Sequence, residues 1–315
     1  MRAVAVTEFK GEPSLVDLPT PEPGPGEVLV HLSAAGINPV DALIADGMYD
    51  GTMPHTFPLV LGVDGAGTVE ALGPGVTHFA VGDRVFGRLI HPPIGHGTYA
   101  DYTSGPEDQL AMVPDAVTDA QAAALPVAGM TALGMVDRLG RGDLSGRTVL
   151  IVGATGGVGS FATQLAASRG ARVIVTAKPD AASRMRELGA SEVIDHTASP
   201  LAEQVEAAHP EGVYALIDVV SDRRAFAELA ALVQDGGVAQ STIGSADPDA
   251  LDARGITGGN FTAAGGLEPL DRLAAAVRDG GLQVLIDEEV TLADAPAALA
   301  RNRAGGARGK TVIVM

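Results

Sequence analysis

One stretch constrains the fold of this chain more than any other: an apolar run, a glycine-rich turn and a helix-like segment in direct succession. The run 149–152 is partly β-branched and predicts a buried strand. The turn 153–159 follows, and 160–167 is typical of a helix. In this context backbone N–H groups and the helix N-terminus attract the pyrophosphate of a dinucleotide. Alanine replaces the first glycine of the strict pattern at position 154, and an ordinary βα turn without a ligand is the alternative.

Strand-like and helix-like segments alternate on both sides of this turn. The predicted strands are 148–152, 172–176, 192–194, 214–218 and 237–240, with a sixth expected within 256–264. The predicted helices between them are 158–169, 180–188, 200–208 and 223–233. Because parallel strands need crossover connections, this alternation predicts an α/β fold with a doubly wound parallel sheet of the Rossmann type.

The flanking segments differ from this middle part. Short strands with frequent turn signals predict a small, partly open barrel, with strands at 1–7, 28–36, 62–73, 82–87 and 97–102. An alanine-rich helix covers 119–139, interrupted near Pro126 and Gly129. The tail predicts helices at 267–279 and 293–302 and strands at 284–290 and 310–314. We expect the tail to return to the first domain, which gives a domain of residues 1–118 with 265–315 and a nucleotide-binding domain of residues 119–264.

The composition of the chain limits which partners and which kinds of chemistry are possible. The 315 residues suit two domains, and the net charge of −18 argues against nucleic acid or an anionic membrane as a partner. The absence of cysteine excludes disulfides, thiolate metal sites and a thiol nucleophile. There is no serine nucleophile elbow, no apolar run of membrane-spanning length and no signal-peptide pattern. We therefore expect a cytoplasmic protein.

Seven short motifs, spread over nearly the whole length, resemble one family. They are Gly36–Asp41, Gly62–Gly67, Ala128–Leu133, the glycine-rich turn, Leu188–Ala190, Val193–Asp195 and Gly309–Lys310. Together they resemble the zinc-free medium-chain dehydrogenases/reductases of the quinone oxidoreductase type. The resemblance implies that the β-rich domain is GroES-like and that the protein is a homodimer. It further implies pairing through an edge strand of the nucleotide sheet, for which 255–262 is the candidate.

The resemblance also bears on metal. Zinc-dependent relatives carry cysteine where Asn38 stands, and Gly-His-Glu where this chain has Gly62-Val63-Asp64. Without these ligands, catalytic and structural zinc are not expected.

The end of the second strand indicates which nicotinamide cofactor is used. An acidic residue at this place usually binds the ribose hydroxyl of NADH, but the first charged residue here is Lys178, and Arg184 follows. Cations suit the 2′-phosphate of NADPH, although Asp180 remains an argument for NADH and the two cations can be a solvated surface pair. His196 stands where relatives often have a tyrosine beside the adenosine end, or it caps a loop. The expected cofactor-binding residues are Thr131, Thr155, Gly156, Gly157, Val158, Ala177, Lys178, Arg184, His196, Val219, Ile243 and Lys310.

The resemblance implies two catalytic residues. Asn38 stands at the floor of the family's cleft, where it can donate to a substrate carbonyl, position the nicotinamide ribose, or simply form an Asn-Pro turn. Tyr49 stands where related reductases have an active-site tyrosine, either as a proton donor or packed over the cleft. Thr131 lies near the nicotinamide ribose in the family, or its hydroxyl bonds its own helix. His55, His91 and His96 lie in loops and are expected at the surface.

These observations predict a function of the following kind. The protein is expected to use NADPH to transfer hydride to a small-molecule quinone or to the C=C bond of an α,β-unsaturated carbonyl, without zinc. The alternatives are a non-catalytic NADPH-binding sensor or structural protein of the same fold, and an enoyl reductase of the polyketide or fatty-acid type. The substrate pocket is made from loops, so the sequence does not identify the physiological substrate.

Overall fold

The computed structural model of the protein describes all residues from 1 to 315 and divides into two compact units. The first unit combines Met1–Met130, Gly265–Gly280 and Val284–Met315, and the second combines Thr131–Ala264 with Gly281–Gln283. The first boundary lies at Met130, whereas the sequence analysis placed it at residue 118. Helix α2 (Asp119–Ala123) accounts for this difference, because it packs against strands of the first unit.

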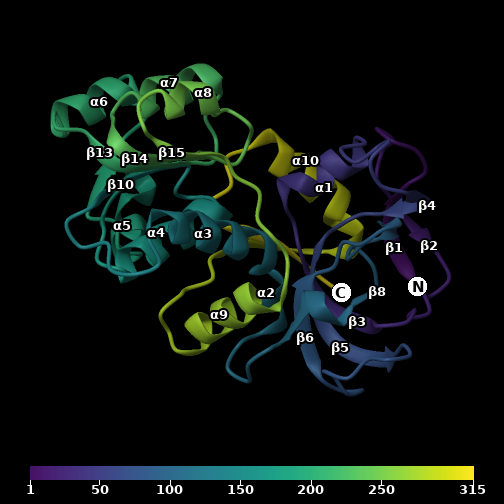
Figure 1. Cartoon of the computed structure of the whole chain (residues 1–315). Coiled ribbons are helices and arrows are strands. Elements are labelled where there is room, and N and C mark those ends of the chain that lie inside the picture. The colour runs from purple at the N-terminus through teal and green to yellow at the C-terminus, as the bar shows by residue number, and fades with distance from the viewer. The chain divides into compact units, whose positions relative to one another are not determined.

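The second unit is a six-stranded parallel sheet with helices on both faces (Figure 1). Its strands are β10 (Thr148–Val152), β11 (Arg172–Thr176), β12 (Glu192–Ile194), β13 (Val213–Asp218), β14 (Val233–Ser241) and β15 (Thr257–Asn260). Its helices are α4 (Gly157–Ser168), the 3₁₀ turn η2 (Pro179–Ala181), α5 (Ala182–Glu187), α6 (Leu201–Ala208), α7 (Arg223–Ala230) and α8 (Pro248–Asp252). The strand order β12-β11-β10-β13-β14-β15 reverses direction between β10 and β13, which is the doubly wound topology predicted from the sequence.

Apolar side chains on both faces hold this sheet in place. Leu150, Ile174 and Leu216 come from three neighbouring strands and are fully buried. On one face they pack with Val205 of α6 and Phe226 of α7, and Figure 1 shows α6, α7 and α8 together on that side. Helices α4 and α5 lie on the other face. Strands covered on both faces are expected to be continuously apolar, as the β10 and β11 sequences are.

The first unit is β-rich and contains two sheets. Its strands are β1 (Arg2–Val6), β2 (Ser14–Asp17), β3 (Glu27–Gly36), β4 (His55–Val60), β5 (Asp64–Leu72), β6 (Arg84–Arg88), β7 (Ile94–His96), β8 (Tyr102–Pro106), β9 (Leu110–Met112), β16 (Ile286–Thr291) and β17 (Lys310–Val314). One sheet has the order β2-β1-β4-β7; the other has the order β16-β17-β3-β5-β6-β9, with β8 also paired to β3. The sheets do not close into a barrel, and the tail strands β16 and β17 join the second sheet as expected.

Helices complete the first unit. They are α1 (Pro39–Ala45), the 3₁₀ turn η1 (Glu107–Gln109), α2, α9 (Leu267–Arg278), the 3₁₀ turn η3 (Leu292–Asp294) and α10 (Ala295–Ala304). Helices α1 and α10 pack side by side (Figure 1) and share a core with Tyr99 and Leu61. Helix α3 (Pro126–Leu139) begins in the first unit and ends in the second.

Two local predictions are wrong. Residues 97–101 do not form a strand and β8 begins only at Tyr102, because the N–H groups of Thr98 and Tyr99 bond to the carbonyl oxygens of Gly62 and Leu61 and bend the chain between β7 and β8. The helical segment 119–139 is broken only before Pro126, and α3 runs through Gly129 without interruption. Proline cannot continue a helix, whereas a single glycine only weakens one.

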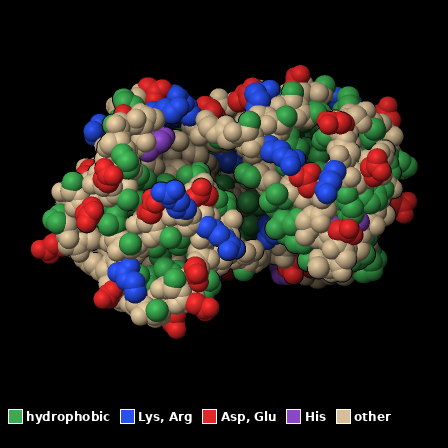
Figure 2. All heavy atoms as spheres, turned by 90° about the horizontal axis from the view of Figure 1, so that it is seen from above, with side chains coloured by type: hydrophobic (Ala, Val, Ile, Leu, Met, Phe, Trp, Pro, Cys, Tyr) green, Lys and Arg blue, Asp and Glu red, His purple; other side chains and the backbone are tan.

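Charged side chains are spread over the surface. Figure 2 shows acidic and basic groups interspersed over one face, with no continuous basic patch across it. None of the helices is both long and apolar enough to cross a lipid bilayer.

Candidate functional site

The carboxyl ends of the parallel strands form one edge of the sheet in the second unit. Open α/β sheets bind ligands outside this edge, at the point where the strand order reverses, here between β10 and β13. The glycine-rich turn follows β10 directly. The other predicted cofactor-binding residues that follow a strand here are Ala177 and Lys178 after β11, His196 after β12, Val219 after β13 and Ile243 after β14. The structure therefore brings these residues to one edge.

The glycine-rich turn has the geometry that a pyrophosphate requires. Gly153 has a φ of 84°, a left-handed conformation that favours glycine. Gly156 is the N-cap of α4 and has no side-chain cap, so the N–H groups of the first helical turn are not bonded by a capping side chain. The nearest atom to a Cβ built on Gly156 is the Gly153 carbonyl oxygen at 3.7 Å, so the space beside Gly156 is open. Thr155, Gly157 and Val158 are half-buried in the same turn, and a dinucleotide fits this cradle.

Two residues that the sequence analysis did not identify hold this edge together. The Thr176 hydroxyl, at the end of β11, accepts a hydrogen bond of 3.2 Å from the Gly153 N–H. Asp218, at the end of β13, accepts bonds from the N–H groups of Val220 and Ser221 at 3.0 and 2.8 Å. Its other carboxylate oxygen is buried without a protein partner at the edge where the cofactor is expected. Each is the polar residue at the end of an apolar strand, and this pattern is the feature of the sequence from which the two residues could have been identified.

Lys178 and His196 lie close to the same carboxylate after β11 and β12. Asp195 accepts hydrogen bonds from the hydroxyl and N–H of Thr197, which lower its pKa, and the charges of His196 and Lys178 lower that pKa further. Lys178, Arg184 and His196 are exposed, and Ala177 is buried. The end of β11 therefore presents a cation and no carboxylate before Asp180.

Thr131 and Lys310 lie elsewhere in the chain's structure. Thr131 belongs to α3 in the second unit and is buried. Lys310 begins β17 in the first unit and is also buried. Contacts of these two residues with a cofactor stay predictions.

A cleft of about 430 Å³ opens on the first unit. Its lining residues are Tyr49, Met53, Arg88, Ile90, His91, Pro92, Pro106, Asp108, Gln109 and Gly265. Most of this wall is apolar, and Tyr49 is half-buried in it, packed against the core of the unit. The structure therefore brings one of the two predicted catalytic residues, Tyr49, to a cleft of ligand size.

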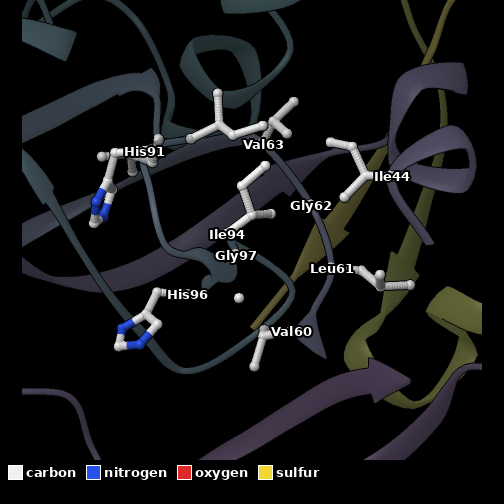
Figure 3. A pocket seen from close by; sticks show the side chains of 12 residues that line it. Ile44, Val60, Leu61, Gly62, Val63, His91, Ile94, His96 and Gly97 are labelled. Carbon is white, nitrogen blue, oxygen red and sulfur yellow. The ribbon is translucent and has the colours of Figure 1, made fainter. Parts of the chain in front are cut away.

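A second cavity next to the cleft is far smaller, at about 20 Å³ (Figure 3). In Figure 3, His91 and His96 lie on one side of it and Ile44 and Leu61 on the other. Its volume suits about one water molecule, so it cannot hold a substrate. His91 lines both cavities, which differs from the surface position expected for it, while His96 is exposed.

Asn38, the other predicted catalytic residue, lies inside a buried polar network. Its side-chain amide donates to the Asp64 carboxylate at 2.9 Å and to the Gly36 carbonyl at 3.3 Å. Its side-chain oxygen accepts from the Lys310 ammonium at 2.5 Å, and its backbone N–H donates to Asp41 at 2.8 Å. Asn38 is 2% exposed and does not line the cleft. In this geometry no amide hydrogen is left for a substrate carbonyl, so Asn38 holds other groups in position.

The network connects distant parts of the first unit. Lys310 also donates to the Ile37 carbonyl at 2.9 Å, which ties β17 to the start of α1. Asp64 accepts from the N–H of Val127 at 3.1 Å and so caps the N-terminus of α3. Tyr99 donates to Asp41 at 2.6 Å. Because the partners lie far apart in sequence, no local pattern could have indicated this network.

Burial shifts the titration of these groups. Desolvation raises the pKa of Asp41 to about 7, although the hydrogen bonds from Tyr99 and Asn38 act in the opposite direction. Desolvation likewise raises the pKa of Asp64 to about 6, against the charge of Lys310. The pKa of Lys310 is lowered by burial, and that of Tyr99 is raised well above its usual 10. The network therefore holds a proton near neutral pH inside the core rather than at the cleft.

The cysteine and the histidine that zinc-dependent relatives carry are replaced here by Asn38 and Val63. Val63 offers no donor atom, and no group of three or more His, Asp or Glu side chains in the structure is arranged to hold a metal ion.

Two families match segments of the chain. The alcohol dehydrogenase GroES-like domain matches residues 24–115, and the zinc-binding dehydrogenase family matches residues 188–313. The first match covers most of the β-rich N-terminal segment, which confirms that this unit is GroES-like.

Individual relatives are similar over almost the whole chain. A chloroplastic quinone-oxidoreductase of Triphysaria versicolor is 31% identical, with 99% of this chain and 98% of the relative covered. A mitochondrial NAD(P)H oxidoreductase of Mus musculus is 29% identical, with 92% of this chain and 82% of the relative covered. A mycobacterial protein solved with NADPH is 30% identical, with 100% of both chains covered and a TM-score of 0.85.

These similarities agree with the geometry of both units. The second unit has the sheet edge and glycine turn of a dinucleotide-binding domain, and the first has a cleft that contains a phenol. The Mus musculus relative is named an NAD(P)H oxidoreductase. The chain is therefore an oxidoreductase that belongs to the quinone oxidoreductase family of medium-chain dehydrogenases/reductases.

Proposed function

We propose that this oxidoreductase uses NADPH to reduce a small quinone, or the C=C bond of an α,β-unsaturated carbonyl, without zinc. The observation that carries the proposal is the cleft of the first unit. Its wall is largely apolar, as a planar quinone or enone requires, and Tyr49 supplies a hydroxyl donor within it. The lining contains no serine and no cysteine, so covalent acyl chemistry through such a nucleophile has no support.

The proposed chemistry assigns one step to the protein's own residues. A bound nicotinamide supplies the hydride, which is two electrons and one hydrogen nucleus. The Tyr49 phenol donates a proton to the oxygen that becomes a hydroquinone or enolate oxygen, and solvent returns that proton to the phenolate. The apolar wall excludes water from the acceptor and orients its ring or double bond. Asn38, Asp64 and Lys310 hold the starts of α1 and α3 in place, and none of the three lines this cleft.

The preference for NADPH over NADH is supported by the end of β11. Lys178 is the first charged side chain there, and Arg184 follows six residues later. Two cations at this place favour a 2′-phosphate. The NADPH complex of the mycobacterial relative adds support, since that protein is similar over the whole chain.

Zinc independence is supported by the residues at the family's metal position. The Asn38 side chain is hydrogen-bonded to Asp64 and to Lys310. Asp64 also accepts a hydrogen bond from the Val127 N–H, and Val63 has no atom that could bind a metal ion. We also propose that the enzyme works in the cytoplasm, a location that its net charge of −18 suits.

The test follows NADPH oxidation spectroscopically with three sets of acceptors: small quinones, enones, and the saturated ketones that correspond to the enones. Turnover of quinones or enones, without turnover of the ketones and unchanged by a zinc chelator, is the expected result. Reduction of the saturated ketones would instead indicate an alcohol dehydrogenase activity. Loss of activity after chelation, restored by zinc, would overturn the zinc-independent mechanism.

A further inference from the structure

Exposed hydrophobic side chains are concentrated beside the cleft of the first unit. Twelve large hydrophobic side chains are exposed in the whole chain, and four of them come from the short segment 43–57. These four, which we call the apolar rim, are Leu43, Met48, Met53 and Phe57, and they are between 39% and 53% exposed. Apolar groups that are exposed together are typical of binding surfaces, whereas single exposed ones need no explanation.

The backbone of this segment places the rim next to the phenol of the cleft. Helix α1 ends before Gly47, whose φ of 95° is the left-handed conformation that often ends a helix. The N–H groups of Thr52 and Met53 then bond to the Tyr49 carbonyl oxygen at 3.1 and 3.0 Å, so Met53 lies one turn after Tyr49. Met48 directly precedes Tyr49, and Met53 itself lines the cleft. The rim is therefore continuous with the cleft through Met53.

Contacts with Phe9 join the two ends of the segment. The rings of Phe9 and Phe57 meet edge to face, with their centroids 5.1 Å apart. Phe9 also lies beside Gly47, where an added Cβ would be 3.4 Å from its ring. The N–H of Met48 bonds to the Leu43 carbonyl oxygen at 2.9 Å. Because Gly47 and Phe57 lie against the same ring, the rim is one region of the surface rather than four scattered positions.

The surroundings of the rim indicate what covers it. The segment 43–57 contains no Lys or Arg, and the chain has a net charge of −18, so an anionic lipid surface is not favoured. A stable protein interface takes about 20–30 residues on each side, far more than the rim provides. The cleft, at about 430 Å³, is within the range of about 300–1,000 Å³ that is typical of ligand pockets, so it has room for more than one quinone ring. A ligand that begins in the cleft and extends past Met53 would cover the rim.

We propose that the quinone or enone this enzyme reduces carries an apolar chain of several carbon atoms, which leaves the cleft past Met53 and packs on the apolar rim. The inference rests on the proposed function and names the substrate class of the same cleft. In this arrangement Tyr49 serves the reacting oxygen and the rim binds the chain. Methionine is flexible and polarizable, so Met48 and Met53 fit chains of different shapes. Because each buried methylene adds to the binding free energy, affinity should increase with the length of the chain.

The test compares two matched enones, pent-3-en-2-one and non-3-en-2-one, which share the reacting double bond and carbonyl and differ only in the length of the alkyl chain. We expect wild-type kcat/KM for the longer enone to exceed that for the shorter one by about tenfold or more, mainly through KM, because the added methylenes are partly buried on the rim. The pair 2-methyl- and 2-hexyl-1,4-benzoquinone gives the same comparison for quinones. In Met53→Gln the ratio should fall by about threefold or more, since an amide replaces the thioether, whereas Met53→Leu should keep most of the preference.

A second variant and a matched control separate the rim from general effects of surface polarity. Met48→Gln changes a rim residue outside the cleft lining and should lower the ratio by about twofold or more. The control is Met112→Gln, on β9 of the same unit, where the side chain is exposed to a similar extent but does not line the cleft; it should leave the ratio unchanged. A ratio near one in the wild type would overturn the inference. A high ratio that persists in the double variant Met48→Gln/Met53→Gln would overturn it as well.

Two measurements on the double variant identify other occupants of the rim. Wild-type flotation with phosphatidylcholine vesicles that the variant loses, without a preference for the longer enone, would assign the rim to a lipid surface. A fall from dimer to monomer mass in light scattering of the variant, again without that preference, would assign the rim to a contact between two copies of the chain. Either result would refute the proposed apolar chain.

A separate binding measurement keeps the inference distinct from the proposed function. Calorimetric titration of the enzyme with NADP⁺ bound compares pentan-2-one with nonan-2-one, neither of which has a C=C bond to reduce. Tighter binding of the longer ketone that depends on Met48 and Met53 supports the inference even if no acceptor is turned over. Turnover of short quinones or enones without any preference for the longer ones would leave the proposed function standing and refute the inference.

Discussion

Lys178 and Arg184 are the residues on which the choice between NADPH and NADH depends. Both are exposed, so each is expected to contribute modestly to binding a 2′-phosphate. Replacing both with alanine should raise the Kd for NADPH by about tenfold and leave that for NADH nearly unchanged. Fluorescence titration with both cofactors measures this, and the difference should shrink at high salt because exposed charges are screened. Equal losses for both cofactors would contradict a role in 2′-phosphate binding.

Tyr49 is the residue proposed to donate the proton. Tyr49→Phe keeps the ring in the cleft wall and removes the hydroxyl, so kcat should fall by about 100-fold while KM changes little. Steady-state kinetics with a quinone measures both constants. A normal kcat in this variant would mean that Tyr49 only shapes the cleft, which is the alternative interpretation of its position.

The buried carboxylate of Asp41 links stability to pH. Its pKa is raised to about 7 in the folded protein, against about 4 in an unfolded chain. The folded state therefore binds this proton more tightly, and the stabilisation present below about pH 4 is lost as the pH rises through 7. Asp64, with a pKa of about 6, acts in the same direction. Carboxylates with a lowered pKa, such as Asp101, titrate below this range.

Between pH 5 and pH 8 the free energy of unfolding should accordingly decrease, by about 1 kcal/mol or more. Asp41→Asn cannot ionise and should show a smaller decrease over the same range. Urea unfolding at several pH values measures the slope for each protein. Asp50→Asn, which alters an exposed carboxylate, serves as the control and should keep the wild-type slope. A steeper slope in Asp41→Asn would rule out this linkage.

The residues of the site differ in how far the sequence predicts them. Gly156 and Lys178 follow predicted strands at once, so their place at the sheet edge could be inferred from chain order alone. The partners of Asn38 could not, because Asp64 and Lys310 meet it only through the pairing of β3 with β5 and β17. Arg88 carries no motif, and its place in the cleft depends on that same sheet.

At the scale of elements, two glycines of the turn between β10 and α4 have different roles: one is needed for folding and the other is expected to matter for cofactor binding. A Cβ on Gly159 would lie 2.3 Å from the Gly153 carbonyl oxygen, so glycine there is needed for the turn itself. A Cβ on Gly156 meets nothing closer than 3.7 Å, so alanine fits the folded turn but adds a methyl group beside the backbone that we propose the pyrophosphate approaches. Gly156→Ala should therefore melt within about 2 °C of wild type but bind NADPH at least tenfold more weakly.

Thermal denaturation and cofactor titration of the same samples check this prediction. Gly142→Ala is the matched control, because a Cβ there also meets no atom within 4 Å and Gly142 lies outside the turn. It should change neither quantity. Normal NADPH affinity in Gly156→Ala would show that the pyrophosphate does not approach this turn.

Helices and strands were predicted correctly where the pattern of apolar and polar residues was clear. The strands β10, β11 and β12 have the predicted limits, since each is a short apolar run closed by a turn signal. The segment 97–102 resembles a strand in composition, but backbone bonds from Leu61 and Gly62 bend it, and those bonds cross between distant segments. Tertiary hydrogen bonding of this kind leaves no local sequence signal.

At the scale of the whole molecule, β15 is the outer strand of the parallel sheet and has no neighbour on one side. Thr257, Gly258 and Asn260 in this strand are exposed. Exposed strand edges favour pairing with a second copy, and the sequence resemblance implies a homodimer formed in this way. Light scattering should therefore give the mass of a dimer.

Thr257→Lys would place like charges near each other across a two-fold axis and should shift the mass toward the monomer. The control is Glu206→Lys, at an exposed position on α6. It tests whether a change of surface charge alone has this effect, and it should leave the dimer intact. A monomer mass for the wild type over a wide concentration range would contradict the dimer.

The position of β17 has a consequence for how the chain is made. This strand, residues 310–314, lies between β16 and β3, so the large sheet of the first unit is completed by residues translated after all of the second unit. During synthesis, residues 131–264 can leave the ribosome and fold while β3 still has an open flank and Asn38 still has no lysine beside it. The first unit therefore begins to be synthesised first and is completed last. A nascent chain stalled before residue 310 would expose the unpaired edge of β3 to chaperones and to other chains.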